Sequence, residues 1–198
     1  MIFQRSAKGY YELTDTIETV RLSLRFPLMD HYQQWRELRK QSRAFLVPWE
    51  ASWPADDLSR GAFSYRLKHY RGNVRKDNAY PLLIFKADGN KELVGGITVS
   101  NVRRGIAQTA QLGYWIGQPH ANMGYMSEAV RAVADFCFDQ LSLNRLEAAC
   151  LINNGPSARV LEKCGFIQEG VARKYLKING QWQDHLLFAL LRDDCQSV

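Results

Sequence analysis

The chain has 198 residues, of which 46% are hydrophobic and 23% are charged, and its formal net charge is +6. This length and apolar content suit one domain with one substantial core, and they exclude fibrous, collagen-like and disordered proteins. The longest apolar run, residues 186–191, is far shorter than the roughly 18 residues that a membrane helix needs. The chain opens without a continuous apolar signal segment. We therefore expect a soluble, cytoplasmic protein with no membrane partner.

The basic residues are scattered along the chain, in no block longer than a pair such as Arg103 and Arg104. A solvated basic surface explains this pattern. A positive potential would also attract RNA or a polyanionic cofactor, so charge alone does not decide among these partners. We expect no direct binding to DNA.

Four cysteines are widely spaced: Cys137, Cys150, Cys164 and Cys195. They form no CxxC pair and lie at no zinc-ligand spacing from the histidines. We expect reduced, structural thiols and no metal site.

The N-terminal third is expected to hold an arm, a strand and two helices. The first residues lack a clear periodicity, so residues 1–17 are expected to form an arm. Residues 18–26 alternate apolar and polar side chains, which predicts one half-buried strand with Val20 on its apolar face. Asp30 is expected to cap a helix over 31–42, where apolar residues recur at helical spacing.

An ordered loop over residues 45–63 leads into a second helix, which is expected to span 57–70. Two strands follow, over 81–87 and 92–102, and the turn at residues 88–90 predicts that they pair antiparallel.

The C-terminal half contains the remaining elements. We expect a strand over 107–116, a helix over 126–141, a strand over 146–152 and a helix over 156–164. A terminal hairpin of residues 171–178 and 182–191 turns at Asn179-Gly180. The predicted fold is α/β, with a single mixed and largely antiparallel sheet of about seven strands and helices on both faces. The domain is expected to span 18–193, followed by a tail over 194–198.

Residues 114–127 predict a strand that ends in a loop and opens a helix. The free backbone N–H groups at such a helix start can hold an anion such as a pyrophosphate. Asn122 tolerates the left-handed conformation that a turn here requires. The alternative is a plain strand-to-helix connection.

Residues 154–166 read NGPSARVLEKCGF and predict a short helix, because Pro156 suits a first helical turn and Gly165 suits a helix end. Asn154 and Ser157 place polar side chains at its start. These two residues serve either a cofactor or only the capping of the helix.

The two segments together resemble the acyl-coenzyme A site of the GNAT N-acetyltransferases. Residues 154–166 match the family pattern Asn-x-x-Ser-x-x-x-Leu-x-Lys-x-Gly-Phe at the same spacing, whereas the loop at 121–126 keeps only Gly124 of the pattern Arg/Gln-x-x-Gly-x-Gly/Ala. Residues 45–50, 166–170 and 177–191 are similar to the RimJ and RimL type of ribosomal-protein N-terminal acetyltransferase, and most of all to the RimJ-type alanine N-acetyltransferases. The resemblance covers residues 18–193 and implies the GNAT fold.

The resemblance implies transfer of an acetyl group from acetyl-coenzyme A to the N-terminal α-amine of a protein, with an N-terminal alanine of a ribosomal protein as the expected acceptor. The amine attacks directly in a ternary complex, without a covalent enzyme intermediate or a metal. The small ribosomal subunit is a further candidate partner. The implied cofactor-binding residues are Tyr114, Trp115, Ile116, Asn122, Met123, Gly124, Tyr125, Met126, Ser127 and Asn154.

Two candidate catalytic residues follow from the comparison. Many GNAT members have a proton-donating Tyr where this chain has Leu161, so Ser157 is the candidate general acid. Glu50 is a candidate general base, and its alternative is a Glu that is solvated or paired with Arg. Trp49, Trp53 and Tyr80 line a groove for a peptide N-terminus or pack in a small satellite core.

Other functions stay open. A small-molecule amine such as a polyamine or an aminoglycoside is an alternative acceptor, although only Asp56 and Asp57 cluster near the loop that holds Glu50. A ribosome-assembly factor with secondary or no catalysis is another possibility. Ala121 and Asn122, which depart from the loop pattern, motivate a third, a degenerate acyl-coenzyme A sensor.

Overall fold

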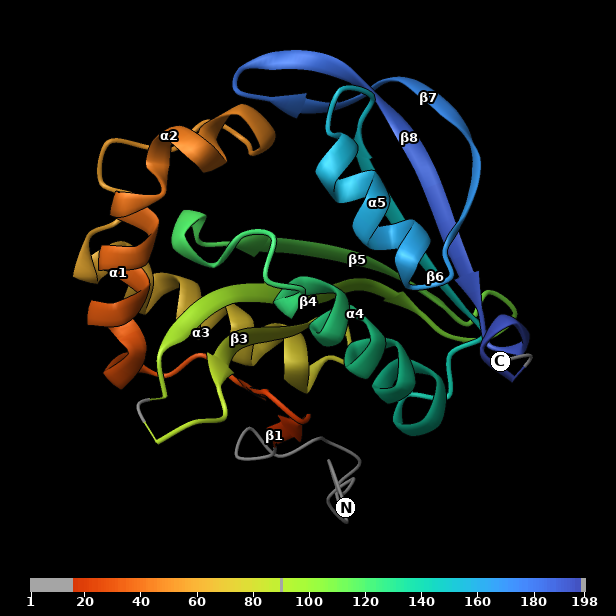
Figure 1. The fold of residues 1–198 in the computed structure, drawn as a ribbon, viewed down its shortest axis with the longest axis horizontal. Coiled ribbons are helices and arrows are strands. Elements are labelled where there is room, and N and C mark those ends of the chain that lie inside the picture. The colour runs from red at the N-terminus through yellow and green to blue at the C-terminus, as the bar shows by residue number, and fades with distance from the viewer. Residues whose placement is uncertain (1–15, 90, 197–198) are drawn as a thin grey trace.

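The structure is a computed structural model and describes residues 16–89 and 91–196. Eight strands form one sheet in the order β1-β2-β3-β4-β5-β6-β8-β7, with helices on both faces (Figure 1). The strands are β1 Thr16–Glu18, β2 Leu22–Arg25, β3 Tyr80–Lys86, β4 Leu93–Arg103, β5 Thr109–Ile116, β6 Arg145–Leu151, β7 Ile167–Ile178 and β8 Gln181–Leu191. The α-helices are α1 Tyr32–Gln41, α2 Arg43–Leu46, α3 Arg60–Arg75, α4 Tyr125–Asp135 and α5 Gly155–Lys163.

The sheet is mixed and largely antiparallel, as predicted. Among the strands of the described residues, only β5 and β6 run parallel, and every other pair of neighbours is antiparallel. The sheet has one strand more than expected because the strand predicted over 18–26 is two strands joined by a turn. Val20 lies in that turn and is 95% exposed, so its prediction as a buried residue is wrong. Thr19 stabilises the turn, since its Oγ1 accepts a hydrogen bond from the Leu22 N–H at 2.9 Å.

The two faces of the sheet are covered by different helices, as Figure 1 shows. The main core lies between the sheet and α4 with α5, and a second cluster lies under α1 and α3. Strand β3 contributes side chains to both clusters. Leu82 and Ile84 belong to the main core, whereas Leu83 and Phe85 belong to the second cluster. The period-two alternation of side chains explains this division.

The N-terminal helices differ from the prediction at their ends. Asp30 lies inside a short 3-10 helix, η1 Met29–His31, and does not cap α1, whose N-cap is His31. The apolar residues that recur at helical spacing along α1, Tyr32, Trp35 and Leu38, are buried. Helix α3 begins later than expected because Ser59 caps it, with Oγ accepting from the Ala62 N–H at 3.1 Å. The segment expected to be a loop, 45–63, begins at the end of α2 and contains a second 3-10 helix, η2 Val47–Trp49.

The C-terminal half follows the prediction closely. Helix α4 continues as a π-helical turn, η4 Phe136–Gln140. The apolar residues that recur at helical spacing along this segment are buried: Met126, Val130, Val133, Cys137 and Leu141. The β7–β8 hairpin turns at Asn179 and Gly180, whose φ angles of 43° and 82° fit a tight primed turn. The last short helix is η5 Asp193–Gln196, and the 3-10 turn η3 Gln118–His120 follows β5.

The division into arm, domain and tail stays a prediction. Residues 1–15, residue 90 and residues 197–198 lie outside the described part, as does the side chain of Cys195. Thr16 and Ile17, from the segment expected to be an arm, belong to β1. Within the described residues, no helix is long and apolar enough to cross a membrane.

Candidate active site

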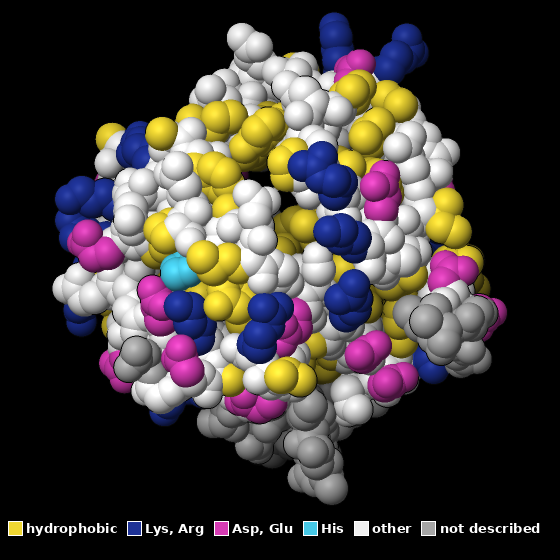
Figure 2. Space-filling view, in the orientation of Figure 1, with side chains coloured by type: hydrophobic (Ala, Val, Ile, Leu, Met, Phe, Trp, Pro, Cys, Tyr) yellow, Lys and Arg dark blue, Asp and Glu magenta, His cyan; other side chains and the backbone are white. Residues whose placement is uncertain are grey.

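The parallel strands β5 and β6 pair over only part of their length. Their register runs from Thr109 opposite Arg145 to Leu112 opposite Ala148, whereas β5 continues to Ile116 and β6 to Leu151. Beyond the last pair the two strands diverge, so one backbone edge of β5 at residues 113–116 is open to other partners. Figure 2 shows the surface hollowed beside α5, with Lys and Arg side chains over α4 and α5 along one side. This opening is a candidate binding site.

The loop after β5 has the backbone geometry that the sequence predicted. Asn122 has a φ of 62° and Gly124 a φ of 78°, so the left-handed conformation expected at Asn122 is confirmed. Gly124 is the N-cap of α4, and no side chain in the described part of the chain caps the helix there. The first N–H groups of α4 are therefore available to an anion, which the helix dipole also favours.

Arg21 reaches this loop from the β1–β2 turn. Its Nη1 donates to the Met123 carbonyl at 3.1 Å, and its Cζ lies 4.9 Å from the centre of the Tyr125 ring. Glu128, in the first turn of α4, holds Arg21 through an Nε to Oε2 bond of 2.7 Å. Arg21 was not among the residues predicted from the sequence, because nothing in its local sequence indicates a contact with Met123, 102 residues away.

Ser157 and Tyr114 meet where β5 and β6 diverge. The Ser157 Oγ lies 2.9 Å from the Tyr114 hydroxyl, which also donates to the Ser157 carbonyl at 3.2 Å. The cap of α5 is Asn154, whose Oδ1 accepts from the Ser157 N–H at 3.2 Å. The Ser157 hydroxyl is thus free of the capping role that was its alternative.

Burial raises the pKa values of two groups around Ser157. It raises the pKa of the Tyr114 phenol above its ordinary value, although the hydrogen bond with Ser157 opposes this shift. Burial likewise raises the pKa of Cys150, which keeps this neighbouring thiol protonated. Leu161, at the position where many GNAT proteins have Tyr, is 1% exposed and packs in the main core. The hydroxyls at this end of the sheet therefore come from Ser157 and Tyr114.

The side chain of Trp115 lies on the opposite face of the sheet, under α1. Gly96 makes room for it, because a Cβ there would lie 2.5 Å from the Trp115 Nε1. The guanidinium of Arg39 stacks on this indole, 5.0 Å from its centre, and on the Trp53 ring at 4.2 Å. Trp115 thus connects the diverging end of β5 with the second cluster.

Glu50 has the Arg-paired geometry that was its alternative. Arg39 donates to both carboxylate oxygens, at 3.0 Å and 2.7 Å, and the Trp53 Nε1–H donates to Oε2 at 2.7 Å. Both oxygens are therefore already engaged by protein donors.

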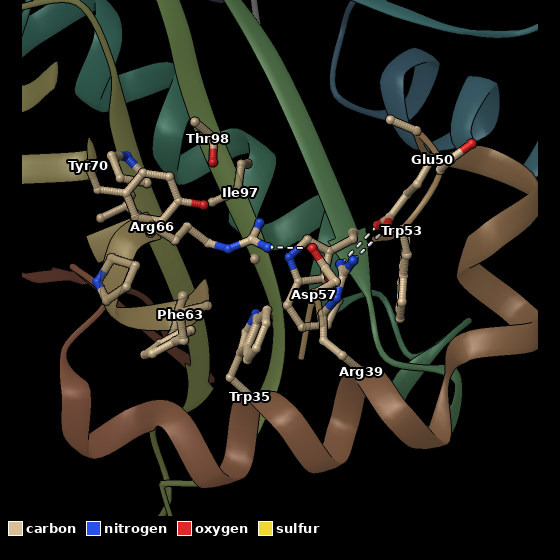
Figure 3. Close-up of a pocket in the computed structure, with 18 residues that line it drawn as sticks. Trp35, Arg39, Glu50, Trp53, Asp57, Phe63, Arg66, Tyr70, Ile97 and Thr98 are labelled. Atoms are coloured by element: carbon tan, nitrogen blue, oxygen red, sulfur yellow. Dashed lines mark hydrogen bonds and ion pairs between the residues drawn. The ribbon is translucent and has the colours of Figure 1, made fainter. Parts of the chain in front are cut away.

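A cavity of about 340 Å³ lies beside this pair, between α1, α3 and β4 (Figure 3). Trp53 lines it together with Trp35, Asp57, Arg66 and Trp115. Tyr80, for which a peptide groove and a small satellite core were the alternatives, packs its ring edge-on against Phe136 in the main core.

Two of the predicted cofactor-binding residues, Met123 and Met126, differ in the exposure of their side chains. Met126 is 6% exposed in the main core, so only its backbone faces the loop, whereas Met123 is 50% exposed.

The thiol of Cys164 donates to the Ser127 carbonyl at 3.3 Å and connects α5 with α4. Cys137, Cys150 and Cys164 are free thiols. Across residues 16–89 and 91–196, no group of three His, Cys, Asp or Glu side chains could hold a metal ion.

Comparison with known proteins agrees with this geometry. The family described as Acetyltransferase (GNAT) domain matches residues 21–167. The chain is 33% identical, over 90% of its length and 91% of the other protein, to the ribosomal protein uS5-alanine N-acetyltransferase of Escherichia coli (strain K12). It is 43% identical, over 65% of its length and 71% of the other protein, to the Probable N-acetyltransferase YjcK of Bacillus subtilis (strain 168).

A solved structure with a similar fold is that of Mycobacterium smegmatis RimJ in complex with CoA-disulfide. It superposes with a TM-score of 0.85 at 29% identity, covering 91% of this chain and 89% of that one. The chain therefore belongs to the GNAT acetyltransferase family and is an acyltransferase related to the ribosomal-protein alanine N-acetyltransferases.

Proposed function

We propose that the protein transfers the acetyl group of acetyl-coenzyme A to the N-terminal α-amine of a protein, and that its acceptor is an N-terminal alanine of a ribosomal protein. One observation carries the proposal: the uncapped start of α4, the open edge of β5 and the Ser157 hydroxyl converge where β5 and β6 diverge. The helix start suits the pyrophosphate of acyl-coenzyme A, the strand edge suits its pantetheine arm, and the hydroxyl suits the departing thiolate.

The residues present fit the cofactor. The backbone N–H groups of residues 122–127 suit a pyrophosphate, and Arg21 adds a positive charge beside them. The open edge of β5, from Tyr114 to Ile116, suits the amide groups of the pantetheine arm. Asn154 stands at the end of β6 beside the same opening, and its Nδ2 is a candidate donor to that arm. When bound, acetyl-coenzyme A supplies the acetyl thioester.

Ser157 is the proposed proton donor to the departing thiolate. Its hydroxyl is held by Tyr114 rather than by the helix cap, so it has a fixed position and a proton to give. We propose no protein base, because an α-ammonium has a pKa of about 8 and is partly neutral near pH 7. Holding the amine and the thioester together then supplies much of the rate enhancement.

The acceptor part of the proposal is supported by the similarity to the Escherichia coli uS5-alanine N-acetyltransferase, which extends over nine-tenths of both chains. A ribosomal protein as acceptor also places the reaction in the cytoplasm. The small ribosomal subunit is the proposed larger partner.

The experiment is incubation with acetyl-coenzyme A and a peptide that begins with alanine, with release of free thiol as the measurement. The same peptide with a blocked N-terminus is the control. We expect thiol release and a mass increase of one acetyl group only with the free N-terminus. Absence of thiol release with every free N-terminus tested would contradict the proposed function.

A further inference from the structure

Helix α3 carries a row of positive charge on its exposed side. The helix contains no acidic residue and five cations: Arg60, Arg66, Lys68, Arg71 and Arg75. Arg66 is paired with Asp57 beside the cavity, whereas the other four cations are exposed. Lys68, Arg71 and Arg75 follow one another at spacings of three and four residues, so they lie in one line along the helix. We call these three residues the basic row.

The basic row has no counter-charge of its own. In the described part of the chain, none of its three side chains forms an ion pair. The acids nearest in sequence are already engaged, Asp57 by Arg66 and Asp77 by Arg104. Like charges three and four residues apart on a helix repel and destabilise it. An anionic partner would offset this repulsion.

The inner side of α3 fixes the direction in which the basic row points. Phe63, Leu67 and Val74 are buried, and Figure 3 shows Phe63 and Tyr70 at the cavity. The row, on the other side of the helix, therefore faces solvent. Helix α3 covers the face of the sheet opposite to α4 (Figure 1). Coenzyme A bound at the start of α4 would leave the row free, so the cofactor is not its anionic partner.

We propose that the basic row binds the phosphate backbone of double-stranded RNA. The planar guanidinium groups of Arg71 and Arg75 match phosphate oxygens with paired hydrogen bonds. The row is about 10 Å long at the rise of an α-helix, and a nucleic-acid duplex carries a negative charge roughly every 2 Å of its axis. Gly72 lies beside the row with open space where a Cβ would be, so a polynucleotide backbone can approach the helix closely. The inference goes beyond the proposed function, because this binding requires neither acetyl transfer nor coenzyme A.

The neighbours of the basic row favour double-stranded RNA over other anions. Ser64 and Tyr65 are exposed on the same side of α3, and their hydroxyl groups suit the 2′-hydroxyls that distinguish RNA from DNA. Tyr65, 75% exposed, is the one exposed Phe, Tyr or Trp of α3, which is too few for a stack of unpaired bases. The exposed side of α3 carries no Leu, Ile, Val or Met that could enter a membrane.

Fluorescence anisotropy with a labelled RNA duplex of about 16 base pairs, the length that an RNA-binding domain spans, tests the inference. The wild type is compared with two triple variants that remove the same charge. One variant replaces the basic row: Lys68→Gln, Arg71→Gln and Arg75→Gln. The matched control replaces three exposed cations of β7: Arg173→Gln, Lys174→Gln and Lys177→Gln. Gln is a good helix former, so α3 should stay folded.

We expect the wild type to bind the RNA duplex with an affinity that falls steeply as the salt concentration rises, because bound phosphates release counterions. The basic-row variant should bind about a hundredfold more weakly near 0.1 M salt, and its plot of log affinity against log salt should be less steep by about two to three. The control should lose less than about threefold, since its charges lie away from the row and are screened. Equal losses in the two variants, or no binding by the wild type, would overturn the inference.

Competition identifies the anion that the row prefers. A DNA duplex of the same length, one strand of the RNA, and polyglutamate of equal charge each compete with the labelled RNA duplex. We expect unlabelled RNA duplex to compete more strongly than all three. Polyglutamate that competes equally well would assign the row to an acidic protein, and an equal DNA duplex would remove the preference for RNA, so either result would overturn the inference.

Two measurements separate the possible failures. Thermal melting shows whether the basic-row variant is folded, and if it is not, Arg71→Gln with Arg75→Gln replaces it and should reduce the salt slope by about two. Peptide acetylation is measured on the same proteins. RNA binding by a wild type that acetylates no peptide contradicts the proposed function and leaves the inference standing. Acetylation by a wild type that binds no RNA contradicts the inference alone.

Discussion

The hydroxyl of Ser157 is separated from the helix-capping role by its neighbour Asn154. Ser often caps a helix by accepting a backbone N–H, but it does so from the N-cap position, which Asn154 occupies in α5. Here the Asn154 Oδ1 accepts the Ser157 N–H, and the Ser157 Oγ instead meets the Tyr114 hydroxyl at 2.9 Å. Removing the Ser157 hydroxyl should therefore change proton transfer without undoing the start of α5.

We predict that Ser157→Ala lowers kcat about a hundredfold, which is typical of a lost general acid, while coenzyme A affinity stays the same. Tyr114→Phe keeps the ring and removes only the phenol, so it should lower kcat less. Steady-state kinetics with an Ala-starting peptide, together with calorimetry for coenzyme A, measure both effects. A Ser157→Ala enzyme with wild-type kcat would show that this hydroxyl is not the proton donor.

Single residues also show what local chemistry can and cannot predict. The left-handed conformation of Asn122 was predictable because Asn is one of the few residues that tolerates it. The environment of Leu161 was not, because its 1% exposure depends on the helices and strands that surround it. The role of Arg21 was not predictable for the same reason, because its local sequence does not indicate the contact with Glu128.

The start of α4 is held by the β1–β2 turn through Glu128. Thr19 Oγ1 donates to Oε1 at 2.6 Å, the Arg21 N–H donates to Oε1 at 3.0 Å, and Arg21 Nε donates to Oε2 at 2.7 Å. Burial alone would raise the pKa of Glu128, but these hydrogen bonds outweigh it and hold the pKa below its ordinary value of 4.5. One carboxylate thereby fixes the position of Arg21 beside the anion-binding loop.

A lowered pKa in the folded protein means that the unfolded chain binds the Glu128 proton more readily. The contribution of Glu128 to stability is therefore complete above the unfolded pKa and is lost as the pH falls through the folded pKa. We predict that Glu128→Gln lowers the free energy of unfolding by about 1 kcal/mol near pH 7, which corresponds to a melting temperature roughly 2–4 °C below that of the wild type. This gap in melting temperature should close below about pH 4.

Melting curves of the wild type and Glu128→Gln between pH 3 and pH 7 measure this gap. Glu162→Gln is the control, because Glu162 is an exposed glutamate on α5. A gap that is independent of pH, or equal to that of the control, would contradict the role of Glu128.

Across the whole molecule, Glu50 connects α1 and its own loop with the β7–β8 hairpin, which is distant in sequence. Its carboxylate binds Arg39 of α1 and Trp53 of the following loop, and its carbonyl accepts the Asn179 N–H from the tip of the β7–β8 hairpin at 2.9 Å. The hairpin arches over the sheet toward α2 in Figure 1. Glu50, in the wall of the cavity, thus depends on a contact between the N-terminal third of the chain and the C-terminal hairpin.

We predict that Glu50→Ala destabilises the protein by about 3–5 kcal/mol, because it leaves the buried guanidinium of Arg39 without its counter-charge. Glu37→Ala removes an exposed partner of Arg36 on α1 and should cost less than about 1 kcal/mol. Denaturant unfolding measures both. If Glu50→Ala keeps wild-type stability but loses kcat, Glu50 acts as a base and this structural role is wrong.

The α/β class and the places of most helices and strands were predictable from the sequence, because side-chain periodicity and helix-end chemistry are local properties. The family was predictable because residues 154–166 match its pattern at the same spacing. The sequence also predicted the loop at Asn122 and the helix start at Asn154. Only the tertiary structure split the first strand, buried Leu161, paired Glu50 with Arg39 and set Arg21 beside α4. These outcomes depend on contacts such as that of Arg21 with Glu128, 107 residues apart, whose energies exist only once the chain has folded.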